Sequence, residues 1–389
     1  MPRAADSRRI AWAELNLLNA TGALADELEG ARIGKGTPVH DLGGEELFHR
    51  YPLAAPRRPL GYADVAVHAA FGAPLLSVSQ GFPWDEQALV RQATQAARKR
   101  AGRLKWDEIR FVAYSYPKVA VQFLAGGEEV LLLELATWQP VPAAPDRRPY
   151  EPPSDFERWS FLAELRSPVR RRNESRYRKR LDRWEELLAR ARSIRTDAIL
   201  LERFGRYVDL RPDLLLDTRE LHYSRVNSDH FTCYEVRGQQ TNVWCVAASV
   251  EMILDFYRYE YTQVRLAQEL GLGTLANPNG LPYSRDGDVV TVLGNMTSAA
   301  LTGSMNTSPS WTEFRSEIRD NRPLISFVPG HARTVAGYTR SGILTLGLAA
   351  FRGLLVYDPW PPTTGVITRW ENFDAQAYRV TFTARVTLV

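Results

Sequence analysis

The sequence has few cysteines, and this scarcity limits the chemistry open to the chain. Its 389 residues include two, Cys233 and Cys245, twelve positions apart. Two cysteines at this spacing predict neither a disulfide framework nor a metal-binding motif. Five of the six histidines also lack metal-ligand spacing among themselves, namely His40, His49, His68, His222 and His230. We therefore expect no metal ion and no cofactor, and a reduced thiol stays available for chemistry.

Long apolar runs are also missing. No segment approaches the length of a membrane span. The basic N-terminus is not followed by an uninterrupted apolar stretch, so a secretory signal is not expected. These absences predict a cytoplasmic protein, and export by a machine that needs no signal is left open.

A strong charge of one sign is absent as well. The net charge of +4 is small for this length, and the basic residues concentrate between positions 166 and 195. Apolar residues recur at helical spacing there, with acidic residues between them: Leu181, Trp184, Leu187, Leu188 and Ala191, with Asp182, Glu185 and Glu186. This pattern indicates an amphipathic helix with a solvated basic face, so nucleic-acid binding is not expected.

Length and composition predict an α+β protein of two domains joined by a linker. Residues 1–140 are expected to form an N-terminal α+β domain, with helices at 12–28 and 86–103 and strands at 109–114, 118–123 and 130–135. Residues 141–224 begin with a proline-rich stretch and continue into the basic helical region, with helices at 156–166, 173–195 and 200–207. Residues 225–389 are expected to form the second domain.

Three segments of the second domain carry residues suited to nucleophilic acyl chemistry. Gln239 precedes Cys245, and an apolar helical pattern begins at that cysteine. His331 follows the apolar run 324–328, and Asp358 follows a second apolar run. Together these residues supply a thiol, a base, a carboxylate to orient the base and an amide to hold an oxyanion.

The thiolate is the reactive form of cysteine, so the pKa of Cys245 matters. At a helix N-terminus, unpaired N–H groups favour negative charge, and His331 as imidazolium would pair with the thiolate. Both effects are expected to lower the thiol pKa, while Asp358 fixes the imidazole tautomer. The plain alternative is a buried thiol at the start of a core helix. Cys233 is expected to be such a packing residue, in a strand at 229–236.

In order and spacing, these residues resemble a papain-like cysteine peptidase over about residues 225–389. The resemblance is to the bacterial branch that includes bacteriocin-leader peptidases and effector proteases of plant pathogens. It rests on a glutamine six residues before the cysteine, on the His-Ala-x-x-x-x-Gly-Tyr run that begins at His331, and on Asp358-x-Trp360. It implies a nucleophile helix packed against an antiparallel sheet, with the active site in the cleft between them.

The resemblance also assigns roles to single residues. It implies that the Gln239 side chain and the Cys245 backbone N–H hold the oxyanion; Gln240 is one residue short of that spacing. Papain has an asparagine where this chain has Asp358, and the aspartate is expected to favour the imidazolium form more strongly. Trp360 would shield the bond between His331 and Asp358.

The implied activity is cleavage of peptide bonds through Cys245, His331 and Asp358 by way of a thioester. The substrate would be a protein or peptide, and the N-terminal domain is a candidate for binding a partner protein. A transglutaminase, deamidase or acyltransferase activity is the first alternative, because all of these also pass through a thioester. The second alternative is a catalytically silent papain fold kept as a binding or scaffolding module.

Overall fold

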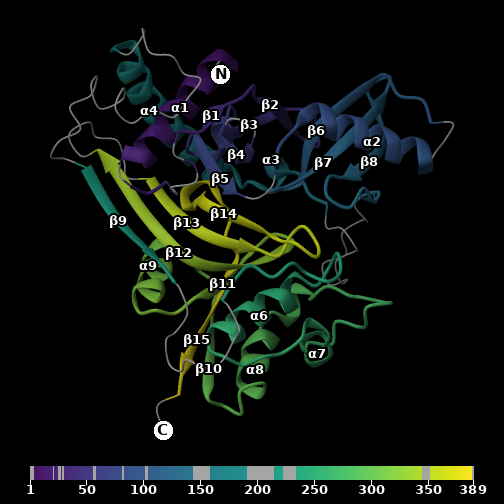
Figure 1. Ribbon diagram of the computed structural model, residues 1–389, viewed down its shortest axis with the longest axis vertical. Helices are drawn as coiled ribbons and strands as arrows, with labels where there is room; N and C mark the ends of the chain where they lie inside the picture. The colour runs from purple at the N-terminus through teal and green to yellow at the C-terminus, as the bar shows by residue number, and fades with distance from the viewer. Residues whose placement is uncertain are drawn as a thin grey trace.

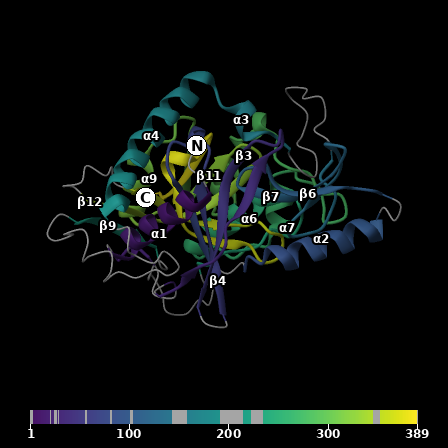
Figure 2. The same cartoon turned by 90° about the horizontal axis from the view of Figure 1, so that it is seen from above.

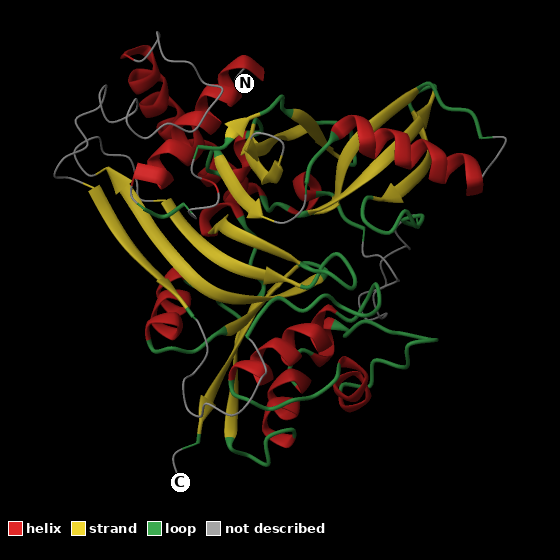
Figure 3. Cartoon of the chain, viewed as in Figure 1, coloured by secondary structure: helices red, strands yellow, loops and turns green. Residues whose placement is uncertain are grey.

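The structure is a computed structural model that describes residues 4–20, 22–24, 28, 30–55, 58–80, 83–100, 104–142, 158–190, 214–221, 234–343 and 351–387. Within these residues the strands join into one large mixed sheet. Its strand order is β10-β15-β11-β12-β13-β14-β5-β4-β3-β2-β6-β7-β8, with β1 paired to β3 and β9 paired to β12. Figures 1 and 3 show the sheet and the helices around it. The expectation of a mixed α+β fold is confirmed.

The first part of the sheet comes from the N-terminal residues. Its strands are β1 (Arg32–Ile33), β2 (Thr37–Asp41), β3 (Glu46–Ala55), β4 (Arg58–Ala66), β5 (Leu75–Gln80), β6 (Glu108–Ser115), β7 (Lys118–Ala125) and β8 (Glu128–Glu134), and its helices are α1 (Ala4–Ala20), the short η2 (Ala69–Phe71) and α2 (Glu86–Arg100). The predicted meander is confirmed as β6, β7 and β8. The helix predicted at 12–28 begins and ends earlier than expected, and strands β2 to β5 were not predicted.

Two further helices, α3 (Phe161–Glu164) and α4 (Ser167–Arg190), follow the proline-rich stretch. The amphipathic character predicted for the basic region is confirmed in α4. Trp184 is fully buried and its indole N–H donates to Glu14 of α1 at 2.7 Å, while Arg180 pairs with the same carboxylate. Seen from above, α4 and α2 lie on opposite sides of the molecule (Figure 2). The helix expected at 200–207 lies outside the described residues.

The C-terminal part supplies the other end of the sheet. Its strands are β9 (Leu214–Glu220), β10 (Leu301–Asn306), β11 (Leu324–Val328), β12 (His331–Ile343), β13 (Phe351–Asp358), β14 (Val366–Asn372) and β15 (Val380–Val386), and its helices are α6 (Cys245–Phe256), α7 (Gln263–Glu269), η3 (Tyr283–Arg285), α8 (Asp288–Asn295), α9 (Trp311–Arg319) and η4 (Phe373–Ala375). Helix α6 packs on β11 and β12. A helix that starts at the cysteine and lies against an antiparallel sheet is the arrangement that the sequence predicted.

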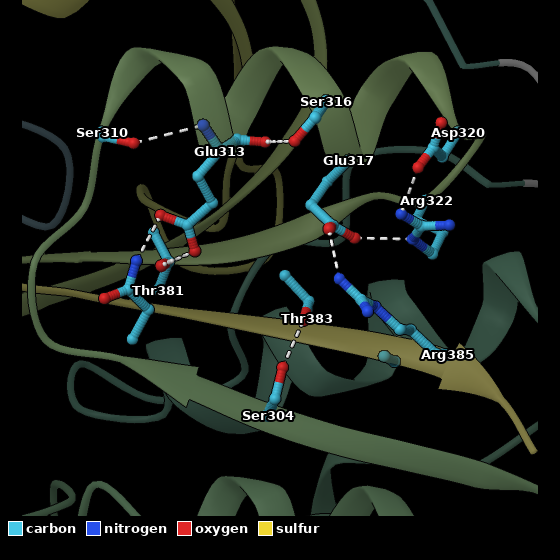
Figure 4. A network of polar contacts seen from close by, with 12 residues as sticks. Ser304, Ser310, Glu313, Ser316, Glu317, Asp320, Arg322, Thr381, Thr383 and Arg385 are labelled. Carbon is cyan, nitrogen blue, oxygen red and sulfur yellow. Dashed lines mark hydrogen bonds and ion pairs between the residues drawn. The ribbon is translucent and has the colours of Figure 1, made fainter.

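Helix α9 is fixed to the end of this sheet by a polar network (Figure 4). Thr381 of β15 donates to Glu313 at 2.6 Å, and Glu317 accepts from both Arg322 and Arg385 at 2.6 and 2.7 Å. Since β15 pairs with β11, and β11 with β12, these bonds hold the strands that lead to His331.

The two parts of the chain share one sheet through β5 and β14, with Thr368 opposite Ser79 and Trp370 opposite Val78. The Asn372 amide donates to the Leu75 carbonyl oxygen at 2.8 Å across the same junction. One apolar core likewise combines residues of α1, β4 and β5 with residues of β12, β13 and β14. The domain boundaries at 140 and 224 stay predictions, and no break in the sheet marks the passage between the two parts.

One smaller strand prediction was wrong in the residues that can be compared. Residues 234–236 are not in a strand, and the remainder of the 229–236 segment, with Cys233, lies outside the described residues. Strand β12 runs on to Ile343, and its second half pairs with β9. Residues 344–350 are not described.

Candidate active site

Cys245 is the first residue of α6. The preceding Trp244 is fully buried, and its indole N–H donates to the Leu272 carbonyl oxygen at 3.0 Å, which anchors the start of the helix. No described side chain caps α6. Its first backbone N–H groups are therefore available to an anion at the position of the thiol.

His331 and Asp358 come from neighbouring strands. Pro329 and Gly330 turn the chain from β11 into β12, and Gly330 has a φ of 66°, a conformation that glycine adopts without strain. His331 Nε2 lies 2.6 Å from Asp358 Oδ1 at the end of β13. The Trp360 backbone N–H donates to the same oxygen at 2.8 Å. Asp358 therefore holds the proton on Nε2 and leaves Nδ1 as the basic nitrogen.

Cys245 and His331 line one cavity that opens to solvent. His331 Nδ1 is buried and has no hydrogen-bond partner among the described residues. The backbone N–H of Ala332, the next residue, lies against the Cys245 sulfur. The structure thus brings the thiol and the strand that carries the base to the same opening, with Asp358 on the far ring nitrogen.

Burial determines the protonation states of Cys245 and His331 in the free protein. It raises the pKa of Cys245, against the Lys118 charge and the backbone N–H groups of Ala332 and Val246, which favour the anion. It also lowers the pKa of His331 to about 4, although the Asp358 charge opposes this. The expectation of a lowered thiol pKa was wrong, because loss of solvation outweighs the charges around the sulfur. The free protein holds a neutral thiol beside a neutral imidazole.

Asp358 stays ionised. Burial alone would raise its pKa, but the charge and hydrogen bond of His331, together with the Arg333 charge, bring the pKa below the ordinary aspartate value. The side chain of Arg333 is itself 1% exposed and is paired with Glu371 of β14, and the Glu371 carboxylate also accepts from Tyr378 at 2.8 Å. A buried ion pair thus supports the strand that carries His331.

Gln239 lies next to the site but is turned inward. Its backbone N–H donates to the Pro359 carbonyl oxygen at 3.0 Å, directly after Asp358. The side chain is fully buried, and its amide donates to the Thr241 carbonyl oxygen at 2.6 Å. The cavity that Cys245 and His331 line does not include Gln239 among its described walls. Its oxyanion role stays a prediction, as does its preference over the exposed Gln240.

Lys118 is a site residue that the sequence reasoning missed. It is the first residue of β7, in the N-terminal part, and it lines the same cavity as Cys245. Its charge favours the thiolate and disfavours the imidazolium. The only signal in the sequence was a lysine in a strand of hydrophobic residues, which by itself does not indicate a site more than a hundred residues away.

Trp360 matches the position of the shielding indole. Its side chain is buried beside Asp358, and its indole N–H donates to Glu134 of β8 at 3.2 Å. Lys118 Nζ lies 4.9 Å from the centre of the indole ring. The N-terminal part therefore covers the His331–Asp358 pair from behind the tryptophan.

Neither a metal cluster nor a membrane-spanning helix is found in the described part of the chain. No three His, Cys, Asp or Glu side chains are grouped there so as to hold a metal ion. No described helix is both long and apolar enough to cross a membrane.

Part of the chain that contains this site is similar to known proteins. The model of the Peptidase_C39 like family matches residues 232–384, which include Cys245, His331 and Asp358. The chain is also similar to a solved structure, "a double glycine motif protease from AMS/PCAT transporter in complex with the leader peptide", at 13% identity over 43% of this chain and 99% of that one, with a TM-score of 0.24. No curated protein matches the chain. The predicted resemblance to papain-like peptidases is confirmed over residues 232–384, which are similar to the Peptidase_C39 like family.

Proposed function

We propose that this protein is a cysteine peptidase that cleaves peptide bonds with Cys245 as nucleophile, His331 as base and Asp358 as the group that orients the base. One observation carries the proposal. The His331 ring is bonded to Asp358 through Nε2 at 2.6 Å, while Nδ1 has no described partner and the ring borders the cavity of Cys245. A structural histidine in a core would have both ring nitrogens satisfied.

The first step joins the enzyme to the substrate. His331 Nδ1 takes the thiol proton as the Cys245 sulfur attacks the peptide carbonyl carbon, so the pair becomes charged only when a substrate is present. The oxyanion accepts a hydrogen bond from the Cys245 backbone N–H, which lies at the start of α6. His331 then gives its proton to the leaving amine, the C–N bond breaks, and a thioester to Cys245 remains.

The second step releases the acyl product. Water enters the cavity and gives a proton to His331 Nδ1 as its oxygen attacks the thioester. The carbon–sulfur bond breaks, the proton returns to the sulfur, and a carboxylic acid leaves. Asp358 stays ionised throughout and stabilises the imidazolium that forms in each step.

A comparison of protein termini tests this function. The purified protein is incubated with a cell lysate, and new N-termini are compared among the wild type, Cys245→Ala and the matched thiol control Cys233→Ala. New N-termini with the wild type and the control, and none with Cys245→Ala, are expected. Cysteine-dependent deamidated or cross-linked products without new termini would show one of the other thioester activities. No cysteine-dependent product would indicate the silent binding module.

A further inference from the structure

Lys118 is a buried cation whose charge is not neutralised. Its side chain is 8% exposed, and its Nζ lies 4.9 Å from the centre of the Trp360 ring. No described carboxylate lies within ion-pair distance of this ammonium group. An unpaired charge in such a place costs stability, which is consistent with a role in binding an anion.

The lysine lies between two cavities. The first is the cavity of Cys245 and His331, and the second is bordered by Asp358 and Trp360. The second cavity lies where the two parts of the sheet meet, with Ser79 of β5 and Thr368 of β14 in its wall.

Every other charged side chain bordering the second cavity has a partner. Arg50 pairs with Asp64 through two hydrogen bonds of 2.7 Å, and Glu371 pairs with Arg333. Asp358 is bonded to His331. The Glu134 carboxylate accepts from the backbone N–H groups of Ala136 and Thr137 and from the Trp360 indole. Among the described residues bordering this cavity, Lys118 is the charge left for a ligand.

Lys118 lies on the side of the cavity that would hold the substrate residues released as the amine. In the proposed reaction, the leaving amine takes its proton from His331, so the released part of the peptide lies toward His331, Asp358 and Trp360. Lys118 lies over Trp360, on that same side. The Lys118 ammonium group therefore lies near the substrate residues that follow the cleaved bond.

We propose that Lys118 binds a carboxylate located just beyond the cleaved bond. This inference rests on the proposed peptidase function and names its substrate class: peptides whose chain ends there, or that carry an acidic side chain there. In the wall of the second cavity, the Ser79 hydroxyl donates to Thr368 at 3.5 Å, so the Thr368 hydroxyl keeps its own proton as a further donor for such a group.

Alkylation of Cys245 tests the site with two reagents of the same chemistry. Iodoacetate carries a carboxylate and iodoacetamide does not, so the ratio of their rate constants cancels any change in the thiolate fraction. Peptide mapping assigns the label to Cys245 and not to Cys233. We expect Lys118→Gln to lower the iodoacetate-to-iodoacetamide ratio about tenfold, and Lys118→Arg to keep it near the wild-type value. An unchanged ratio in Lys118→Gln would overturn the proposal.

Peptide cleavage separates the two sources of the carboxylate. The full-length protein is incubated with peptides from a digested proteome, and synthetic copies of the cleaved peptides are made with amidated C-termini or with Asp and Glu replaced by Asn and Gln. Loss of cleavage on C-terminal amidation assigns the site to the chain end, and loss on the second change assigns it to a side chain. If neither change lowers cleavage, the carboxylate site is wrong while the peptidase function holds. If no peptide is cleaved in a Cys245-dependent way, the peptidase function itself fails.

Discussion

His331 has one ring nitrogen bonded at 2.6 Å to a carboxylate and the other without a described partner, beside the cavity of the thiol. Burial keeps both reacting groups neutral, because it raises the pKa of Cys245 and lowers that of His331 to about 4. The charged pair that the sequence predicted is therefore not the resting state. It forms when a substrate supplies a place for negative charge.

The pH dependence of Cys245 alkylation follows from these pKa directions. A thiol with a raised pKa loses its proton only in alkaline solution, so in His331→Ala the iodoacetamide rate should rise continuously from about pH 5 to about pH 10. In the wild type, neutral His331 can take the thiol proton above its own pKa of about 4, so the rate should be nearly level until the thiolate itself forms. The rate constant at each pH is measured by mass spectrometry of the Cys245 peptide. A rate in His331→Ala that is already constant from about pH 5 to pH 8 would contradict the raised pKa of Cys245.

At this scale, the proximity of Cys245, His331 and Asp358 could be predicted from the sequence, and their pKa values could not. Cys245, His331 and Asp358 each stand beside an apolar run that fixes their element, so order and spacing were informative. The pKa of Cys245 depends on how much water the completed fold removes, and only the tertiary structure brings Lys118 to the cavity of the thiol. Neither quantity is encoded in a local pattern.

At the scale of the elements, β12 connects the site to the rest of the sheet. Its first half pairs with β11 and its second half with β9, while β13 runs along the other edge and carries Asp358. The Thr334 hydroxyl donates to the Ser249 carbonyl oxygen of α6 at 3.3 Å, which joins the histidine strand to the nucleophile helix. Arg333, between His331 and Thr334, is tied to Glu371 of β14.

Removal of one partner of this buried pair should destabilise the protein. Arg333 and Glu371 side chains are 1% and 3% exposed, so Arg333→Met leaves a carboxylate buried without its counter-charge. We expect a loss of about 3 to 5 kcal/mol in the free energy of unfolding, measured by urea denaturation. The double variant Arg333→Met/Glu371→Gln should recover most of it, because no unpaired charge is left. A single variant within about 1 kcal/mol of the wild type would show that the pair does not support β12.

The elements of the site were easier to predict than those that surround it. The helix at Cys245 and the strands at residues 324–328 and 354–357 have uninterrupted apolar patterns. Strands β2 to β5 were missed since their sequences mix apolar with polar and charged residues, such as Arg50 and Asp64, whose mutual bonding makes burial tolerable. A pairing between distant residues does not appear in the periodicity of either strand.

At the scale of the whole molecule, the C-terminal part, with Cys245 and His331, is continuous with the N-terminal part. The outer edge of β14 is covered by β5, and Trp370 is fully buried with its indole N–H donating to the Ala23 carbonyl oxygen. Lys118 and Glu134 also reach across to the site from β7 and β8. The proline-rich stretch suggested a simple linker between independent domains, and the shared sheet gives a physical reason to test that independence.

Separation of the parts is the corresponding experiment. A fragment of residues 214–389 would expose the hydrogen-bonding edge of β14 and the apolar face that packs against α1. We expect it to lack the cooperative urea transition of the full-length protein and to be cleaved faster by trypsin. A fragment that unfolds cooperatively and labels at Cys245 at the full-length rate would show instead that residues 214–389 fold as an independent domain.

The dependence of Cys245 reactivity on His331 tests the central claim most directly. Iodoacetamide labelling of Cys245 at neutral pH is measured in the wild type, in His331→Ala and in the matched control His40→Ala, whose histidine lies on β2 outside the cavity. We predict that labelling slows about tenfold or more in His331→Ala, because the thiol loses its base, and is unchanged in His40→Ala. Equal labelling rates in the wild type and His331→Ala would contradict the account.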